Sequence, residues 1–377
     1  MLSLARSSLR HEFHRYVPAI LAVAFASLLL LIQMALLLGL FGIVTSVIDR
    51  SAAQIWLTCP RLASFDQGTD IPARSALALK ALPAVAATEE VEMLNASVRI
   101  PGGAMIPTTV IGYDLRPHSF VMPAAFRPAL AEALHLPGGV VVDMADADKL
   151  SAKIGTVLEI NGVRAPVVGF TRHFRGVGGV YLFTSIESAR RFSGNGIEVP
   201  AMTTFVAAKL HDPALAQQVR DAVQPSSPNR TFDAWTSQDL SRHSQLYWLF
   251  ETGMGVGVLF SALIGVVVGV VITSQTLRGI ILASLKEYAT LRAMGVSVAS
   301  LRKIVLELAA WIGGLGLVVT AVVAAALAVI ADRSSVSLDF PWWTIAITIV
   351  FTFAVAFASG FIALRVLYTA EPSELLR

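Results

Sequence analysis

A short charged stretch, KEYATLRAMG at residues 286–295, stands between two long apolar runs at about residues 252–276 and 304–331. A membrane-spanning helix needs about 20 consecutive apolar residues, and two further runs of that length occur at about residues 17–45 and 341–364. The charged stretch is therefore expected to lie in water between two spans, where a soluble partner can bind it. The pattern predicts a protein with four membrane spans.

The composition is typical of a membrane protein that also has a substantial aqueous part. Apolar residues make up 55% of the 377 residues and charged residues 15%, against roughly 25% charged residues in ordinary soluble domains. About 200 residues of ordinary soluble composition separate the first two spans, which is enough for one or two domains. The net charge of +3 is too small to indicate a nucleic-acid partner.

Positive charges are distributed unevenly among the segments outside the spans. They gather before the first span, between the second and third spans, and after the fourth, whereas the short loop at 332–340 carries only Arg333 beside two aspartates. Lysine and arginine collect on the cytoplasmic side of a membrane. We therefore expect both termini and the segment 277–303 to be cytoplasmic, and the large domain to be outside. The first apolar run is too long for a signal peptide, so an uncleaved anchor is expected.

These features predict an α-helical membrane protein with four transmembrane helices and a large α+β extracytoplasmic (periplasmic) domain inserted between helices 1 and 2. Residues 1–16 are expected to form a helix that lies in the inner membrane interface. The alternative is that they simply extend the first span into the cytoplasm. The expected segments are the interfacial helix at 1–16, transmembrane helix 1 at 17–45, the periplasmic domain at 46–250, transmembrane helix 2 at 251–276, the cytoplasmic segment at 277–303, transmembrane helix 3 at 304–331, the periplasmic loop at 332–340, transmembrane helix 4 at 341–366 and the cytoplasmic C-terminus at 367–377.

The outer domain is predicted to mix strands with helices. Asn161-Gly162 between two strand-like runs predicts a two-residue hairpin turn, and Asp212 is placed to cap a helix over 213–223. Cys59 is the only cysteine, so no intramolecular disulfide can form, and it is expected to be a small buried apolar group. Further helices are expected at 72–81 and 236–250, and strands at 52–58, 97–100, 108–112, 139–143, 157–160, 165–170, 179–183 and 203–209.

Small side chains recur every four residues along the second span. Such a ridge lets two helix backbones approach closely in a membrane, where van der Waals contact replaces the hydrophobic effect. Two interpretations stay open: a subunit interface or sliding face, and static packing within one chain. The ridge consists of Gly253, Gly257, Ser261, Gly265, Gly269 and Thr273.

The sequence contains none of the motifs that would indicate catalysis. There is no G-x-x-x-x-G-K-[ST], so the chain is not expected to bind ATP. The seven histidines have no metal-ligand spacing, and no cofactor or metal is expected. Glu307 lies inside the third span, four residues after Lys303. A helical pair that reaches back to the interface is the favoured interpretation, and a proton or substrate site is the alternative.

The charged stretch itself is predicted to be a helix that ends at Gly295. On that helix the charges would be displayed, and the apolar side chains would fill a groove in a partner. The residues assigned to this coupling role are Lys286, Glu287, Tyr288, Leu291, Arg292, Met294 and Gly295.

With this stretch and the four-span plan, the chain resembles the FtsX-like permeases of ABC systems, which include MacB-type exporters and lipoprotein-releasing permeases. The variant EYATL before AMG looks closest to DevC-type permeases. The passages VVVD at 140–143, KIGT at 153–156 and VVGF at 167–170 resemble the late part of the family's outer core domain. The terminal EPSELLR at 371–377 resembles the family's usual ending. Residues 60–135 align with nothing familiar.

The resemblance implies a function and a set of partners. The chain would be a homodimeric permease in the bacterial inner membrane, docked at 280–295 on a separate ABC ATP-binding subunit that holds ATP and magnesium. Motion would pass to the outer domains by mechanotransmission and drive export of a lipid, peptide, drug-like or lipoprotein substrate. DevC-like members further imply a periplasmic adaptor and an outer-membrane duct. Two alternatives stay open: a non-transport regulator of a cell-wall hydrolase, and a ligand sensor.

Overall fold

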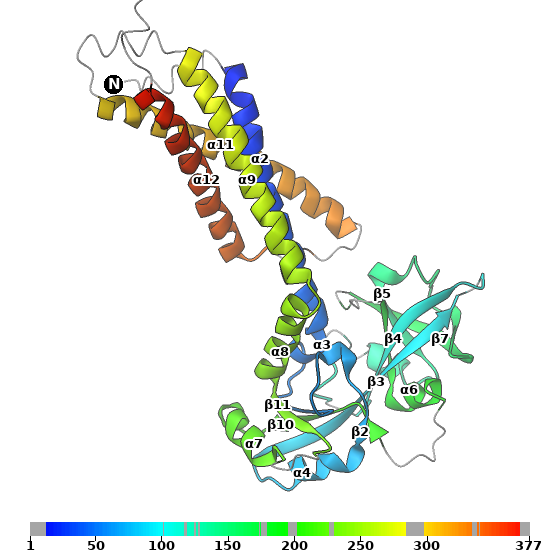
Figure 1. Ribbon diagram of the computed structural model, residues 1–377. Helices are drawn as coiled ribbons and strands as arrows, with labels where there is room; N and C mark the ends of the chain where they lie inside the picture. The colour runs from blue at the N-terminus through cyan, green and yellow to red at the C-terminus, as the bar shows by residue number, and fades with distance from the viewer. Residues whose placement is uncertain are drawn as a thin grey trace, which may run out of the picture. The chain divides into compact units, whose positions relative to one another are not determined.

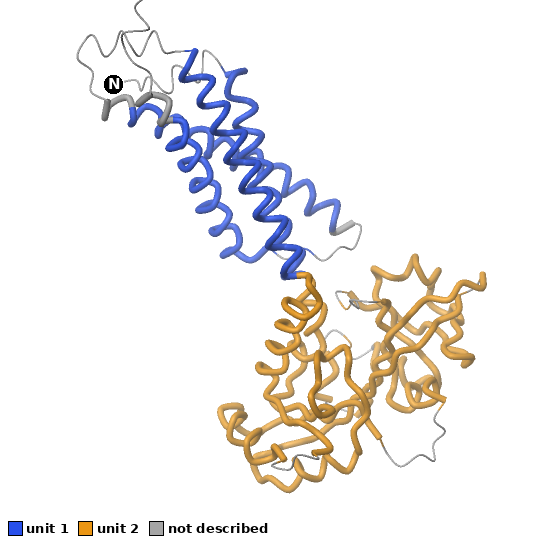
Figure 2. Tube along the Cα trace, viewed as in Figure 1, with its two compact units in different colours: residues 1–39, 255–377 blue, residues 40–254 orange. Residues whose placement is uncertain are grey.

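The computed structural model describes the chain apart from residues 1–12, 101, 117–118, 124–125, 127–128, 173, 175–178, 195–201, 226–229, 284–297, 334–337, 339 and 370–377. The chain divides into two compact units (Figure 2). Unit 1 comprises residues 1–39 and 255–377, and unit 2 comprises residues 40–254.

Unit 1 is made of long apolar helices, four of which have the length and composition needed to cross a membrane (Figure 1). Helix α11 has 36 residues, and at 1.5 Å per residue it is roughly 54 Å long. This exceeds the hydrocarbon thickness of about 30 Å, so the helix continues beyond its apolar run. The chain is a multi-pass membrane protein. Its long helices are α2 (Phe13–Val44), α9 (Met254–Ala283), α11 (Val298–Arg333) and α12 (Trp342–Thr369).

Unit 2 is built on a nine-stranded sheet with the strand order β11-β1-β10-β3-β4-β8-β5-β7-β6. A further pairing of β3 with β6 closes the last six strands of this order into a barrel. A separate two-stranded sheet joins β2 (Ile71–Pro72) to β9 (Met202–Thr203). The strands of the large sheet are β1 (Ile55–Thr58), β3 (Val85–Arg99), β4 (Met105–Tyr113), β5 (Val140–Asp143), β6 (Val157–Ile160), β7 (Val163–Thr171), β8 (Val180–Ser185), β10 (Phe205–Leu210) and β11 (Asp233–Thr236).

Short helices complete unit 2. Helix α6 packs closely on β4, because a Cβ at Gly112 would come within 2.7 Å of the Ala189 Cβ. The α-helices are α3 (Ser46–Asp49), α4 (Ala76–Lys80), α5 (Ala129–Ala133), α6 (Ile186–Phe192), α7 (Ala216–Val223) and α8 (Ser237–Phe250). The 3-10 helices are η1 (Phe65–Gln67), η2 (Ala73–Ser75), η4 (Met144–Asp146) and η5 (Pro213–Leu215).

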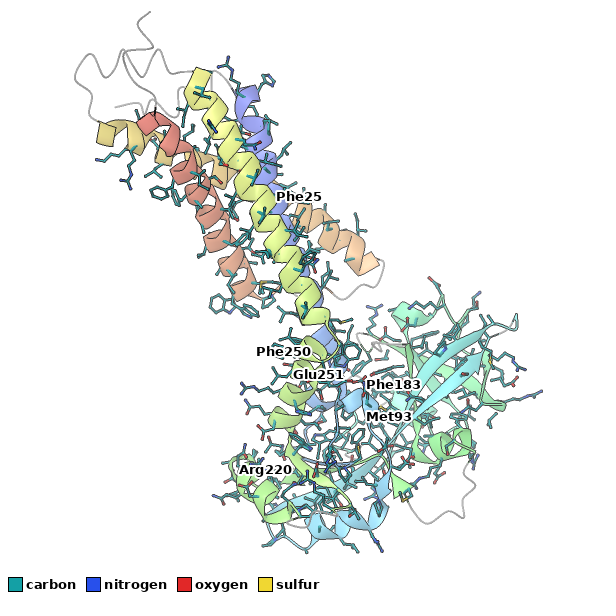
Figure 3. All side chains as sticks on the ribbon, in the orientation of Figure 1. Phe25, Met93, Phe183, Arg220, Phe250 and Glu251 are labelled. Atoms are coloured by element: carbon teal, nitrogen blue, oxygen red, sulfur yellow. The ribbon has the colours of Figure 1, made fainter. Side chains whose placement is uncertain are left out.

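Strand β3 contributes to two separate hydrophobic cores. Val91 and Met93 belong to a core that joins the open part of the sheet to residues of the barrel strands such as Phe183 on β8 (Figure 3), whereas Ala96 and Val98 belong to the core inside the barrel. The 15 residues of this strand therefore run through both halves of unit 2.

Several local predictions in unit 2 are confirmed. Asn161 and Gly162 form the β6–β7 turn, with φ values of 47° and 86°, as a type I′ hairpin turn requires. The Asp212 carboxylate accepts a hydrogen bond from the Ala214 N–H at the start of η5, and Cys59 is buried.

The prediction of a strand over 97–100 was too short, because the strand begins at Val85. The missed part contains Glu89, Glu90, Glu92 and Asn95, which are residue types depleted in strands. Pairing with β10 and β4 on either side overrides this local preference. The strand predicted from residue 52 begins only at Ile55.

Candidate functional site

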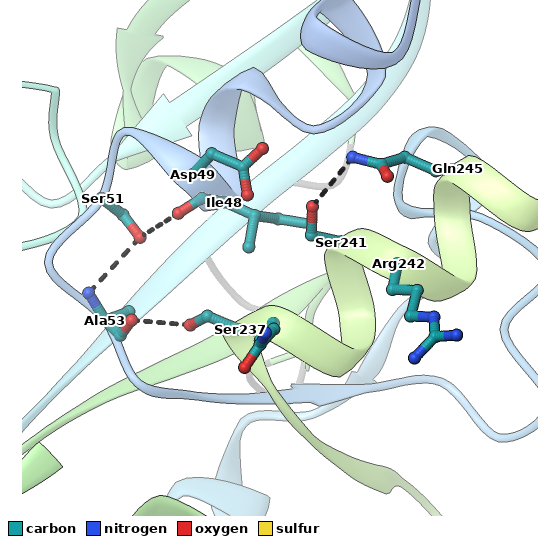
Figure 4. A pocket seen from close by; sticks show the side chains of 9 residues that line it. Ile48, Asp49, Ser51, Ala53, Ser237, Ser241, Arg242 and Gln245 are labelled. Carbon is teal, nitrogen blue, oxygen red and sulfur yellow. Dashed lines mark hydrogen bonds between the residues drawn. The ribbon is translucent and has the colours of Figure 1, made fainter. Parts of the chain in front are cut away.

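The chain enters unit 2 through α3 and leaves it through α8, and the segment that follows α3 is hydrogen-bonded to the first residue of α8. The hydrogen bonds converge on Ser237, the first residue of α8. Its N–H donates to the Gln54 carbonyl at 2.9 Å, and its hydroxyl donates to the Ala53 carbonyl at 2.6 Å (Figure 4). The hydroxyl also accepts from the Trp56 indole N–H at 3.1 Å. We call residues 53–56 together with Ser237 the Ser237 junction.

The Ser237 junction is fixed to the sheet. Strand β1, which continues from it, lies between β10 and β11. The Gln54 side-chain oxygen accepts from the Leu210 N–H at 2.8 Å. The fully buried Trp56 packs edge-on against Phe65 and Phe205. A displacement of either connecting segment is therefore expected to carry the sheet with it.

A second connection runs from the end of α3 to β3 through a buried carboxylate. The Glu89 carboxylate accepts from the Ser119 hydroxyl at 2.7 Å, the Phe120 N–H at 3.1 Å and the Val121 N–H at 3.3 Å. The Phe120 carbonyl in turn accepts from the Ala52 N–H at 2.7 Å. Burial raises the pKa of Glu89, and the three hydrogen bonds oppose that rise. We call this arrangement the Glu89 clamp.

Helix α8 is also held along its length by the loop that follows β1. The Ser244 hydroxyl accepts from the Phe65 N–H at 3.0 Å, and the Trp248 indole N–H donates to the Asp66 carboxylate at 3.1 Å. Within unit 2, the segment that leads to α9 is thus hydrogen-bonded to the loop that follows β1.

A second buried carboxylate, Glu92 on β3, lies between the sheet and α6. One of its oxygens has no hydrogen-bond partner among the described residues and lies 3.8 Å from the Arg190 Nε. Arg190 instead donates to Glu90 at 2.9 Å. Burial, followed by the nearby Asp70 charge, raises the pKa of Glu92 to about 7. No group of His, Cys, Asp and Glu in the described part of the chain could hold a metal ion.

In the structure, the residues of the small-residue ridge have different surroundings. Gly253 precedes α9 with a φ of 78°, and a Cβ at Gly257 would meet nothing within 4 Å. A Cβ at Gly265 would lie 3.3 Å from Leu29 on α2. Further along α9, Gly269 packs against α2 and α12, Thr273 is fully buried, and Ser261 is partly exposed. The half of the ridge from Gly265 onward therefore packs within the chain.

Hydroxyl groups connect the helices inside unit 1, a feature that the sequence analysis missed. The Ser27 and Thr352 hydroxyls lie 2.7 Å apart between α2 and α12, and the Thr320 hydroxyl of α11 donates to the Ala24 carbonyl at 3.1 Å. Among the described residues, Lys303 and Glu307 do not form the ion pair that the sequence analysis expected. One helical turn separates the two residues, and Lys303 is exposed.

The predicted coupling residues at 286–295 lie outside the described residues, between the end of α9 at Ala283 and the start of α11 at Val298. Their role stays a prediction.

Two family models match the chain. The MacB-like periplasmic core domain matches residues 18–226, which is more than half of the chain, and the FtsX-like permease C-terminal model matches residues 259–372. The chain belongs to the FtsX-like, MacB-type permease family. Permeases of this kind are ABC transporter subunits, and the family is in general non-catalytic.

Three solved structures are similar to part of this permease. The extracellular domain of the noncanonic ABC-type transporter YknZ from Gram-positive bacteria is 9% identical, with a TM-score of 0.35, over 48% of this chain and 99% of that one. The periplasmic region of MacB from Actinobacillus actinomycetemcomitans is 10% identical, with a TM-score of 0.35, over 52% and 94%. A domain of a putative permease protein from Porphyromonas gingivalis is 10% identical, with a TM-score of 0.29, over 50% and 89%. No curated protein matches the chain.

Sequence reasoning on this permease did not find Ser237, Glu89 or Glu92. Ser237 had a recognisable signal, since a Thr-Ser pair before a helical run is typical of a helix start. Thr236 does cap α8, accepting from the Asp239 N–H at 3.1 Å. The two glutamates had no such signal, because acidic residues are depleted in strands and predict an exposed segment.

Proposed function

We propose that this chain is the permease subunit of an ABC-type exporter that works by mechanotransmission. A separate ATP-binding subunit hydrolyses ATP and docks on the segment around 286–295. The permease forms a homodimer in the bacterial inner membrane, with both termini in the cytoplasm and unit 2 in the periplasm. Its substrate belongs to the lipid, peptide, drug-like or lipoprotein classes, and a periplasmic adaptor and an outer-membrane duct complete the export path.

The observation that carries this proposal is the hydrogen-bonded connection within unit 2. The two segments that continue into α2 and α9 are joined at the Ser237 junction, and the Glu89 clamp ties the first of them to β3. Because β3 runs through both hydrophobic cores, a movement of the connecting segments would reach both halves of the domain.

The test is charge reversal in the coupling segment. Glu287→Lys and Arg292→Glu should leave membrane insertion and unit 2 folding intact, and should abolish copurification of the ATP-binding subunit and its stimulated ATP hydrolysis. Lys153→Glu, an exposed charge of unit 2, serves as the matched control and should change neither. Unchanged ATPase coupling in both coupling variants would refute the docking site.

The proteins that copurify with the chain from its native membrane separate export from regulation. An ATP-binding subunit together with a periplasmic adaptor is the outcome expected for export. An ATP-binding subunit together with a cell-wall hydrolase would replace the export proposal by the regulatory alternative.

A further inference from the structure

An open groove of about 610 Å³ lies beside the Ser237 junction, between α3 and α8 (Figure 4). Its volume falls within the range of about 300–1,000 Å³ that is usual for small-ligand sites. Most side chains along its walls are hydroxyls, amides or charged groups. The groove lies wholly within unit 2 and is distinct from the coupling segment.

Two opposite charges line this groove from different helices. Asp49 ends α3 and Arg242 lies on α8, and both are exposed. Among the described residues, the two do not form an ion pair with each other, although their charges are opposite. The Asp49 carboxylate accepts one hydrogen bond, from the Thr45 hydroxyl at 2.5 Å, and Arg242 has no partner among the described residues. Figure 4 shows Asp49 on α3 and Arg242 on α8.

Uncharged donors surround Arg242 on the same helix. Gln238, Ser241 and Gln245 lie four residues before it, one before it and three after it, and all line the groove. Residues three and four apart share one face of a helix. The wall formed by α8 therefore offers a guanidinium together with the amides of Gln238 and Gln245, which suits a group with several acceptor oxygens.

We propose that this groove binds a zwitterionic phosphoamine, with the phosphate held by Arg242 and its neighbouring amides and the ammonium group held by Asp49. A simple anion would pair with Arg242 but would place its charge in the same groove as the Asp49 carboxylate. A simple cation would pair with Asp49 but would place its charge in the same groove as the Arg242 guanidinium. A ligand that carries both charges can pair with both residues. A phosphate also uses more of the α8 donors than a carboxylate would.

Binding to the purified full-length chain in nonionic detergent tests the proposal. Calorimetric titrations would compare phosphoethanolamine with inorganic phosphate, ethanolamine and β-alanine. We expect phosphoethanolamine to bind at least about tenfold more tightly than the other three, since a hydrogen bond to a charged group contributes about 1.5–3 kcal/mol. Asp49→Asn and Arg242→Gln should each weaken it by about tenfold or more. Arg74→Gln, at an exposed arginine remote in sequence from both walls, should leave it unchanged.

The same chemistry could come from a lipid headgroup or from a soluble compound. Native mass spectrometry in detergent doped with phosphatidylethanolamine or phosphatidylglycerol distinguishes the two sources. Retention of phosphatidylethanolamine that depends on Asp49 and Arg242 supports a lipid ligand, and binding of phosphoethanolamine alone supports a soluble one.

Three results would overturn the proposal: equal affinity for phosphate and phosphoethanolamine, binding that survives both substitutions, or a change in self-association as their only effect. Because the readout is binding, Glu287→Lys should retain it. Failure of this proposal is therefore distinguishable from failure of the coupling proposal.

Discussion

Glu92 shows how a single buried side chain can make this domain sensitive to pH. Its side chain is only 9% exposed, and one oxygen has no hydrogen-bond partner among the described residues. The charged form is therefore poorly solvated, and the nearby Asp70 and Glu90 charges disfavour it further. Arg190 opposes them, but it is already committed to Glu90 at 2.9 Å.

We predict that Glu92 destabilises the domain as the pH rises through neutrality. Its pKa is raised from 4.5 to about 7 in the folded state, so its neutral form is fully favoured below pH 4.5 and that contribution is lost as the pH passes 7. Glu92→Gln should be more stable than the parent at pH 8, by about 1–3 kcal/mol, and about equal to it at pH 4. Thermal unfolding across this range measures the difference, and parallel curves for both proteins would contradict it.

The Ser237 hydroxyl is predicted to contribute to stability through two partners at once. Ser237→Ala leaves the Ala53 carbonyl and the Trp56 indole N–H without this partner, which should cost about 1–3 kcal/mol. Ser97→Ala is the matched control, since Ser97 is half-buried and its hydroxyl forms no hydrogen bond with any described residue. Chemical denaturation of the full chain in detergent, followed by tryptophan fluorescence, measures both variants. An equal loss in the two would show that the junction has no special role.

At the scale of elements, α9 has two different halves. Its small residues from Gly265 onward allow α2 to approach closely, as glycine does at membrane helix contacts, whereas Gly257 faces open space. The regular spacing in the sequence thus covers both a packed and an unpacked stretch of one helix face.

This difference yields a prediction from a matched pair of substitutions. In Gly269→Ala the new methyl group would lie 2.8 Å from the Ala26 Cβ and 3.4 Å from the Val355 Cγ1, so the helices must move apart at a cost of about 1–3 kcal/mol. Gly257→Ala should be neutral or slightly stabilising, because alanine favours a helix more than glycine does. Thermal stability of the two variants in detergent is the measurement. A larger loss for Gly257→Ala would contradict this packing.

At the scale of the whole molecule, the proposed orientation makes a prediction that does not depend on substrate or partners. In a Cys59→Ala background, which removes the single thiol, Lys153→Cys should react with a membrane-impermeant maleimide in intact spheroplasts. Arg292→Cys should react only after the membrane is permeabilised. Lys153 is exposed on unit 2, so its reactivity reports the side of the membrane and not burial. The reverse pattern would invert the topology.

The sequence by itself determined the membrane spans, the family and several turns and caps. These features depend on neighbouring residues: about 20 apolar residues are needed to cross a bilayer, and Asn-Gly supplies the backbone angles of a tight hairpin wherever it lies. Periodicity likewise revealed the small residues of α9 without any knowledge of their contacts.

Only the tertiary structure decided which residues meet across long separations in sequence. Strand β3 was only partly predicted, because its glutamates disfavour a strand until β10 and β4 pair with it on both sides. Ser237 meets Trp56 across 181 residues, and Glu89 meets Phe120 across 31. The groove between Asp49 and Arg242 likewise exists only because α3 packs beside α8. Such contacts depend on how the sheet folds, and no local pattern encodes them.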